Sequence, residues 1–393
     1  MQPLEGIRVL DLSRVLTGPF CSMILADLGA EVIKVEMPGT GDDTRTWGPP
    51  FLASESAYFL CLNRNKKSVV LDLKSEKERA VLLELAKKSD VFLENFSPGV
   101  TEKLGVDYEN IRRVNPRIIY CSISGFGQTG PYRDRPAYDI VLQGMGGLMG
   151  ITGEPDRPPV RIGVAITDIG AGMYAAIAIL ATLIVREKIE RGQWIDISLL
   201  DGTISWMTYM AANYFATGKI PERMGSAHPT IVPYQCFETM DGKYLILAVG
   251  NDRLWKNFCR ALNLEDLVDD PRFATNPKRV ENRTQLIPRL NEIFLSKTRN
   301  DWLQILLREH VPCAPVYTMD EVFSDPQVLH RDMLVEMEHP TAGKIKQIGS
   351  PMKFSETPVR VEAPPPLLGQ HTEYVLRNVL GYTDEDVRRF KEN

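Results

Sequence analysis

Short apolar, β-branched runs alternate with helical patterns through the first 200 residues, and this alternation constrains the fold more than any other feature. Such alternation is typical of a parallel sheet covered by helices. The predicted strands are Ile7–Leu12, Glu31–Glu36, Ser68–Asp72, Asp90–Glu94, Arg117–Ser122 and Gln193–Ser198. The predicted helices between them are Gly18–Leu28, Glu76–Lys88 and Ile169–Ile189. We therefore expect an α/β fold with an open, Rossmann-like parallel sheet.

The pattern changes after a helical stretch at 201–216. Two alternating segments, Tyr234–Glu238 and Tyr244–Val249, flank the turn dipeptide Asp241-Gly242 and predict a hairpin. Helices are predicted near 252–262, 283–296 and 299–309, and strand-like segments return from about residue 333. The sequence thus predicts a large domain built from 1–200 and 330–393, a helical linker over 201–224, and a smaller α+β domain over 225–325.

Charge and cysteine usage narrow the possible partners. Lys and Arg number 46 against 51 Asp and Glu, and no basic block is present, so nucleic acid is not an expected partner. The six cysteines are scattered without a CxxC pair, and residues 1–7 contain no secretory leader, so we expect a cytoplasmic protein. Ile169–Val185 lacks charges and could be mistaken for a membrane span. Its two glycines, and the lack of a basic flank with an aromatic belt, favour a buried helix.

Several common catalytic motifs are missing or stand in the wrong context. Gly125–Gly130 matches GxGxxG, but Pro131 and Pro136 follow and no helix begins there, so a loop is expected in place of a dinucleotide site. The sequence contains no P-loop motif and no GxSxG motif, and its five histidines lack the spacing of metal ligands. We therefore expect neither a metal nor a tightly bound cofactor.

Asp168 lies between an apolar strand-like run and the apolar helix predicted from Ile169. Two interpretations remain open on the residues alone. The side chain of Thr167 or Asp168 could cap the helix by accepting from its free N–H groups. Alternatively, Asp168 could be a partly desolvated carboxylate that acts as a nucleophile.

Several motifs together resemble the class III CoA-transferases, also called the formyl-CoA transferase or carnitine CoA-transferase family. The similarity extends over nearly the whole chain. The motifs are LDLSRVLTGP at 10–19, DLGAEVIKVE at 27–36, NKKS at 65–68, ENFSPG at 94–99 and LGQHT at 368–372.

The resemblance implies a role for Asp168, which matches the family's nucleophilic aspartate. In the family mechanism this carboxylate attacks the acyl-CoA thioester and gives an aspartyl anhydride and free CoA thiolate. The thiolate then forms an aspartyl-CoA thioester, which the acceptor carboxylate attacks. One thioester replaces another, so CoA and acyl-CoA are substrates and neither ATP nor a metal is required. Each step passes through an oxyanion, for which hydrogen-bond donors are expected near Asp168.

The resemblance also implies a CoA site. Lysines in it would bind the CoA phosphates, and the other residues would contact adenine and pantetheine. Lys103 stands where relatives often have arginine. The matching positions are Val15, Leu16, Leu71, Lys74, Asn95, Phe96 and Lys103.

Three positions depart from particular branches of the family. Formyl-CoA:oxalate relatives have a glutamine where this chain has Leu16, and a glycine run that Ser226–Tyr234 does not contain. The 2-methylacyl-CoA racemases share the fold but use a histidine base where this chain has Tyr138. An unperturbed phenol is a poor proton acceptor at neutral pH, so a racemase-type isomerase is the alternative and not the preferred function.

Other segments most resemble the succinyl-CoA:glutarate (hydroxymethylglutarate) branch, among them GDDTRTWGPPF at 41–51 and IVPYQ at 231–235. The resemblance therefore implies succinyl-CoA or acetyl-CoA as donor and a small dicarboxylic acid as acceptor. An arginine can grip the second carboxylate of such an acid with two hydrogen bonds, and Arg45 and then Arg14 are the candidates. Family members form interlocked homodimers, and we expect the same here.

Overall fold

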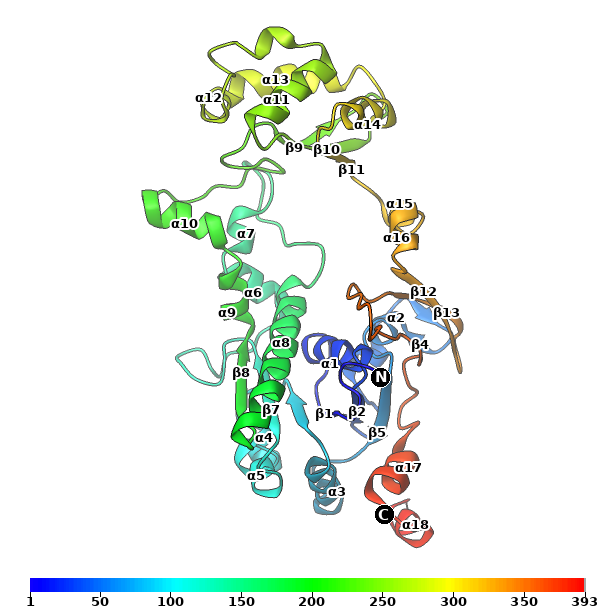
Figure 1. Ribbon diagram of the computed structural model, residues 1–393. Helices are drawn as coiled ribbons and strands as arrows, with labels where there is room; N and C mark the ends of the chain where they lie inside the picture. The colour runs from blue at the N-terminus through cyan, green and yellow to red at the C-terminus, as the bar shows by residue number, and fades with distance from the viewer. Residues whose placement is uncertain (392–393) are drawn as a thin grey trace. The chain divides into compact units, whose positions relative to one another are not determined.

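The computed structural model describes residues 1–391, and the chain divides into two compact units (Figure 1). The first contains residues 1–148, 162–211 and the segment from 326 onward, and the second contains 149–161 and 212–325. The predicted small domain, 225–325, falls within the second unit. Residues 149–161 also belong there, because the Arg223 guanidinium donates hydrogen bonds to the carbonyl groups of Glu154, Pro155 and Arg157.

A six-stranded parallel sheet forms the centre of the first unit, in the order β5-β2-β1-β6-β7-β8. In chain order this is strand 3-2-1-4-5-6, the doubly wound arrangement of Rossmann-like folds, and ligands bind such sheets where the order reverses, between β1 and β6. The bounds are β1 (Arg8–Asp11), β2 (Glu31–Glu36), β5 (Lys66–Val70), β6 (Val91–Glu94), β7 (Ile119–Ser124) and β8 (Trp194–Ser198).

Helices cover both faces of this sheet, as the parallel topology requires. Successive strand residues point to opposite faces, so Val9 of β1 joins the core under α1 and α8, while Leu10 joins the core under α3, α5 and η3. The bounds are α1 (Thr17–Asp27), α3 (Glu76–Lys87), α4 (Val100–Leu104), α5 (Tyr108–Val114), α6 (Asp139–Met145), α8 (Ile166–Ile189), α9 (Leu199–Ser205) and η3 (Val375–Leu380), the last a π-helix.

Helix α8 is the only described helix long and apolar enough to cross a membrane by length and composition. It packs instead against α1, α9, β7 and β8, and the side chains of Ala171, Ala175 and Ile179 are fully buried there. The helix therefore belongs to the protein core along this face, as the sequence predicted.

The remaining elements of the first unit are short. The chain from Leu368 to Thr372 borders edge strand β5, where the His371 Nδ1 accepts from the Ser68 N–H at 3.2 Å and the Thr372 hydroxyl oxygen accepts from the Val70 N–H at 3.1 Å. The bounds are η1 (Asp43–Thr46), β3 (Phe51–Leu52), β4 (Glu55–Ser56), α2 (Ala57–Leu60), α16 (Pro326–His330), β12 (Leu334–His339), β13 (Gly343–Ile348), α17 (Thr372–Tyr374) and α18 (Asp384–Lys391).

The second unit contains the predicted hairpin, extended to a three-stranded antiparallel sheet of order β11-β10-β9. Its own core gathers buried aromatic side chains, among them Phe237, Trp255 and Phe294. The bounds are β9 (Tyr234–Glu238), β10 (Tyr244–Ala248), β11 (Cys313–Pro315), α11 (Asp252–Leu262), η2 (Glu265–Leu267), α12 (Asn276–Glu281), α13 (Arg283–Phe294), α14 (Arg299–Arg308) and α15 (Met319–Val322). Helices α7 (Leu148–Ile151) and α10 (Thr208–Thr217) lie where the chain passes between the units.

Candidate active site

Asp168 is half-buried in the first turn of α8. One of its carboxylate oxygens, Oδ1, accepts a hydrogen bond from the hydroxyl of Thr17, the first residue of α1. Burial raises the pKa of Asp168 to about 6, although the Thr17 hydrogen bond opposes this shift, and the nearby Asp139 carboxylate adds to it. Asp168 is therefore mostly ionised at neutral pH but less well solvated than an ordinary surface carboxylate.

Another carboxylate caps the helix that carries Asp168. Asp139, the first residue of α6, accepts hydrogen bonds from the Thr167 N–H at 2.9 Å and from the Thr167 hydroxyl at 2.8 Å. It is itself held by the Gln143 side-chain amide at 2.7 Å. Asp139 therefore caps the helix, a role for which the sequence had suggested Thr167 or Asp168. The Asp168 carboxylate is not needed as a cap and can react with a substrate.

The Tyr58 phenol of α2 adds a neutral hydroxyl to the surroundings of Asp168. Burial first, and then the charge on Asp168, raise the pKa of Tyr58 to about 12, so its proton stays in place at neutral pH. Its ring makes an edge contact with Trp47 at a centroid distance of 5.2 Å.

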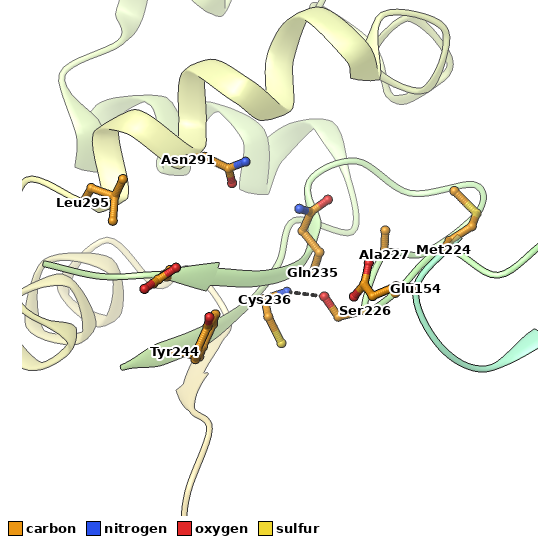
Figure 2. A pocket seen from close by; sticks show the side chains of 11 residues that line it. Glu154, Met224, Ser226, Ala227, Gln235, Cys236, Tyr244, Asn291 and Leu295 are labelled. Atoms are coloured by element: carbon orange, nitrogen blue, oxygen red, sulfur yellow. Dashed lines mark hydrogen bonds between the residues drawn. The ribbon is translucent and has the colours of Figure 1, made fainter. Parts of the chain in front are cut away.

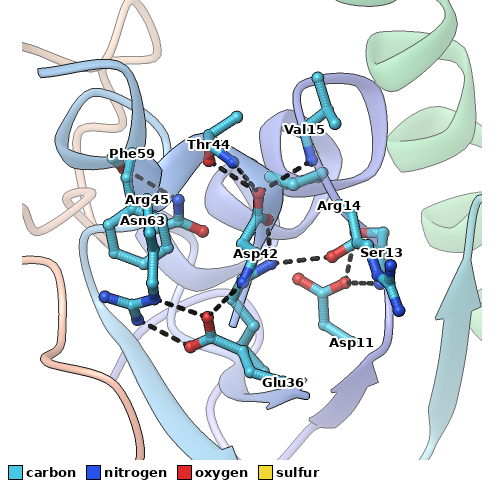
Figure 3. Close-up of polar contacts among 12 residues, drawn as sticks. Asp11, Ser13, Arg14, Val15, Glu36, Asp42, Thr44, Arg45, Phe59 and Asn63 are labelled. Carbon is cyan, nitrogen blue, oxygen red and sulfur yellow. Dashed lines mark hydrogen bonds and ion pairs between the residues drawn. The ribbon is translucent and has the colours of Figure 1, made fainter. Parts of the chain in front are cut away.

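The segment that leads into α1 is fixed by a buried ion pair (Figure 3). The Lys34 ammonium lies 2.8 Å from the Asp42 carboxylate and donates a hydrogen bond to the Ser13 carbonyl at 2.8 Å. Asp42 in turn accepts from the Val15 N–H at 3.3 Å. Burial disfavours the charge on Lys34, but Asp42 and other carboxylates outweigh it and raise the Lys34 pKa.

A second buried lysine binds the first turn of α1 itself. The Lys66 ammonium donates to the Pro19 carbonyl and to the Asn63 side-chain oxygen, both at 2.9 Å, and lies 3.6 Å from the Asp11 carboxylate. Burial lowers the pKa of Lys66 to about 7 despite Asp11. Sequence reasoning missed both lysines, although a lysine within the apolar strand Glu31–Glu36 was a signal for a buried ion pair.

A cleft of about 370 Å³ opens where the strand order reverses. Leu12 and Arg14 follow β1, and Phe96 and Ser97 follow β6, so the cleft lies at the carboxyl ends of these two strands. Its lining is mostly apolar with a few charges, as a site for a long ligand with a charged end requires. The lining residues are Leu12, Arg14, Val35, Glu36, Met37, Leu71, Asp72, Leu73, Lys74, Phe96, Ser97, Val100 and Leu104.

The structure brings together only some of the residues predicted to bind CoA. Leu71, Lys74 and Phe96 line the cleft. Asn95 does not line it, but its side chain accepts from the Arg14 N–H and donates to the Arg14 carbonyl, both at 2.8 Å. Lys103 is exposed on α4, whose Val100 and Leu104 line the cleft.

Val15 and Leu16 lie in the chain between Arg14, which lines the cleft, and Thr17, which donates to Asp168. Val15 has a φ of +67°, a conformation that is unusual for a β-branched residue and concentrates at functional sites. Leu16 is buried as the N-cap residue of α1.

The two arginines proposed for the acceptor carboxylate have different surroundings. The Arg45 guanidinium forms two 2.7 Å hydrogen bonds to the Glu36 carboxylate and lies 3.6 Å from the centre of the Phe59 ring (Figure 3). Arg45 thus takes part in a buried ion pair, and its role toward an acceptor carboxylate stays a prediction. Arg14 lines the cleft, and its guanidinium lies 5.2 Å from the centre of the Phe96 ring.

The GxGxxG match and the position of the racemase histidine can both be located in the structure. Gly125–Gly130 is a loop after β7, and the next helix begins only at Asp139, so the GxGxxG match does not open a helix. Tyr138, at the position of the racemase histidine, is 68% exposed.

A second cavity, of about 560 Å³, lies within the second unit (Figure 2). Two carboxylates, Glu154 and Glu238, line it together with Ser226, whose hydroxyl oxygen accepts from the Cys236 N–H at 3.0 Å. Carboxylates repel an anionic acid, so this cavity is a poor site for a dicarboxylate within the unit taken alone.

Among residues 1–391, no three His, Cys, Asp or Glu side chains come together as a metal site would require.

Comparison with known proteins identifies the family. The sequence profile of CoA-transferase family III matches residues 4–372. The chain is 48% identical to the human succinyl-CoA:glutarate CoA-transferase over 98% of this chain and 88% of that protein. It is 44% identical to the succinate–glutarate CoA-transferase of Agrobacterium fabrum over 95% of each chain.

A solved structure agrees with this match. The crystal structure of a CAIB/BAIF family protein from Brucella suis is 43% identical, covers 96% of this chain and 99% of its own, and superposes with a TM-score of 0.86. A profile match over nearly the full length and relatives of this similarity leave one conclusion. The chain belongs to CoA-transferase family III and is a CoA-transferase.

Proposed function

We propose that the protein moves CoA from succinyl-CoA to a small dicarboxylic acid, with glutarate as the first acceptor to test and Asp168 as the covalent nucleophile. The observation that carries this proposal is the environment of Asp168. Its carboxylate is partly desolvated yet mostly ionised at neutral pH, and it does not cap its own helix, because Asp139 does so. The names of the similar human and Agrobacterium enzymes support the donor and acceptor. A 41% identical enzyme from Acetobacter aceti is named for acetyl-CoA and oxalate, so acetyl-CoA is the second donor to test.

The proposed reaction needs four acyl transfers. Each one breaks a thioester or anhydride bond and forms another bond of these two kinds. The Asp168 carboxylate attacks the succinyl-CoA carbonyl, the C–S bond breaks, and an aspartyl-succinyl anhydride and CoA thiolate form. The thiolate attacks the aspartyl carbonyl, which releases succinate and leaves an aspartyl-CoA thioester. The acceptor carboxylate displaces the thiolate to give a second anhydride, and the thiolate then takes the new acyl group and frees Asp168.

The cleft between the ends of β1 and β6 is the proposed CoA site. Arg14 and Lys74 supply positive charge for phosphate groups, and Leu71 and Phe96 supply apolar surface for the pantetheine and adenine parts. Every group in the four transfers comes from the two substrates or from Asp168, so the proposed reaction has no role for a tightly bound cofactor. A cytoplasmic location remains part of the proposal, and the scattered, unpaired cysteines support it.

We also propose that the first unit is completed by a second copy of the chain in an interlocked homodimer. One face of α8 exposes a stripe of apolar side chains at helical spacing, and α6 and α9, which contact α8, also expose apolar side chains. Soluble monomers rarely expose large apolar patches, so we infer that a second copy covers this stripe. The exposed residues are Met173, Ile177 and Ile184 of α8, Ile140 and Met145 of α6, and Ile204 of α9. Light scattering after size exclusion should report a dimer, and a monomer would contradict this part of the proposal.

A transfer screen tests the function itself. The pure protein is incubated with succinyl-CoA or acetyl-CoA and glutarate, 3-hydroxymethylglutarate, oxalate, citramalate or itaconate, and products are read by mass spectrometry. We expect glutaryl-CoA from succinyl-CoA, and no product with Asp168→Asn. Absence of a new acyl-CoA from every pair, with correctly folded protein, would contradict the proposal.

A further inference from the structure

We propose that Thr17 is a further catalytic residue, whose hydroxyl holds Oδ1 of Asp168, leaves Oδ2 as the attacking oxygen, and stabilises the oxyanion that later forms on Oδ1. The inference rests on the proposed role of Asp168 as the nucleophile. Thr17 belongs to the motif at 10–19 by which the sequence resembles its family, but its side chain received no role from the sequence.

The hydrogen bonds around Asp168 distinguish its two oxygens. Oδ1 accepts from the Thr17 hydroxyl, whereas Oδ2 accepts no hydrogen bond from any residue within 1–391. A hydrogen-bonded oxygen has one lone pair engaged and is the weaker nucleophile, so Oδ2 is the oxygen that attacks the thioester. The asymmetry is fixed before substrate arrives, because Thr17 is buried and β-branched and therefore has few accessible rotamers.

The same contact serves the second acyl transfer. After Oδ2 has become the bridging oxygen of the anhydride, Oδ1 is the carbonyl oxygen of the aspartyl group. Attack of the CoA thiolate on the aspartyl carbon drives negative charge onto Oδ1, where the Thr17 hydroxyl already donates. A hydrogen-bond donor that already points at a developing oxyanion stabilises the transition state more than the ground state, and it therefore lowers the barrier.

The surrounding structure holds Thr17 in place from both sides. Lys34 binds the Ser13 carbonyl before Thr17, and Lys66 binds the Pro19 carbonyl after it. Val15 keeps its left-handed backbone within this clamped segment. Buried charges and an unfavourable backbone angle are costly features, and here both act on the stretch from Ser13 to Pro19, which presents the Thr17 hydroxyl to Asp168.

Helix α8 meets this stretch at a glycine. A methyl group on Gly172 would lie 2.6 Å from the Thr17 carbonyl oxygen, and Gly172 is one turn beyond Asp168 on the same face of α8. The close approach of the two helices therefore brings the hydroxyl and the carboxylate together.

The test compares Thr17→Val, which keeps the shape and removes the hydroxyl, with Thr17→Ser, which keeps the hydroxyl. Thr203→Val is the matched control, because Thr203 is also buried in a helix of the first unit and its hydroxyl donates only to the Leu199 carbonyl. The readouts are kcat and KM for succinyl-CoA, the dependence of kcat on pH, and single-turnover formation of the hydroxylamine-trapped adduct at Asp168.

We expect Thr17→Val to lower kcat about 100-fold, as loss of one oxyanion donor does, with little change in KM. The acidic limb of its kcat profile should move to higher pH, because the lost hydrogen bond had lowered the pKa of Asp168. Thr17→Ser should recover most of the rate, and Thr203→Val should leave the pH profile unchanged. If Thr17→Val does not fold, Thr17→Ala and Thr17→Ser provide the same comparison.

Full turnover and an unmoved acidic limb in Thr17→Val would overturn the inference, and so would a Thr17→Ser enzyme as slow as Thr17→Val. Asp168→Asn separates this failure from failure of the proposed function. A dead Asp168→Asn with a fully active Thr17→Val rejects only the role of Thr17. An active Asp168→Asn rejects the covalent mechanism on which that role depends.

Discussion

Gly172 and Thr17 define how closely helix α8 approaches helix α1, because a methyl group on Gly172 would lie 2.6 Å from the Thr17 carbonyl oxygen. That distance is shorter than any ordinary contact, so only glycine fits at this crossing. Asp168, one turn earlier on α8, reaches the Thr17 hydroxyl through the same crossing.

Gly172→Ala should therefore lower both stability and activity. The added methyl group pushes the two helices apart, and we expect it to cost about 1–3 kcal/mol of the free energy of unfolding. A shift of the carboxylate relative to its partner should lower kcat about 10- to 100-fold. Urea unfolding and steady-state kinetics measure the two effects. Gly150→Ala is the control, since a methyl group there meets no atom within 4 Å, and equal behaviour of the two variants would contradict the prediction.

The pH dependence of kcat/KM should show an acidic limb near pH 6, where Asp168 takes up its proton. The carboxylate must be ionised to attack, so activity is present above this pKa and falls about tenfold per pH unit below it. Asp139→Asn removes a charge that raises the pKa of Asp168, so its limb should move to lower pH. A limb that moves upward or stays in place would contradict the assignment of the limb to Asp168.

Lys34→Met should destabilise the protein by about 3–5 kcal/mol, because it leaves the buried Asp42 carboxylate without its partner. Lys67→Met is the matched control from the neighbouring strand, since Lys67 forms a partly exposed ion pair with Glu31. We expect Lys67→Met to cost less than about 1 kcal/mol. Urea denaturation compares the two variants, and a similar loss in both would show that the buried pair is not a special source of stability.

Arg14→Ala should raise KM for the acyl-CoA and leave KM for the acceptor acid nearly unchanged, because Arg14 lines the cleft at the ends of β1 and β6. Loss of a charge-assisted contact to a phosphate should cost about 1.5–3 kcal/mol, or about 10- to 100-fold in KM. Steady-state kinetics with each substrate varied in turn make the comparison. A rise in the acceptor KM alone would give Arg14 the carboxylate-binding role that the sequence suggested.

Local patterns predicted much of the fold because they report directly on burial. Strand Glu31–Glu36 and helix Asp252–Leu262 have the predicted bounds, since period-two and helical spacing are uninterrupted there. Strand β5 begins at Lys66, two residues before the predicted start. Lysines usually mark the surface, but Asp11 and two carbonyl-type acceptors make burial of Lys66 possible.

The active site was predictable only in part. A carboxylate beside a long apolar helix is visible in the sequence, which makes Asp168 a candidate, and the family resemblance assigns it the role of nucleophile, which stays a prediction. Its partner Thr17 is 151 residues away, and no local pattern connects them. The cap provided by Asp139 likewise depends on packing of α6 against α8. Arg45 carries the charge expected of a substrate-binding residue, but Glu36 lies close enough to bind it inside the protein.

Mass spectrometry of the protein after incubation with succinyl-CoA and hydroxylamine tests directly whether Asp168 is the covalent nucleophile. An anhydride or thioester at Asp168 reacts with hydroxylamine to give a hydroxamate at that residue. We predict this adduct on the peptide that contains Asp168, and its absence in Asp168→Asn under the same conditions. Glutaryl-CoA formation without any adduct at Asp168, or with undiminished rate in Asp168→Asn, would contradict the account.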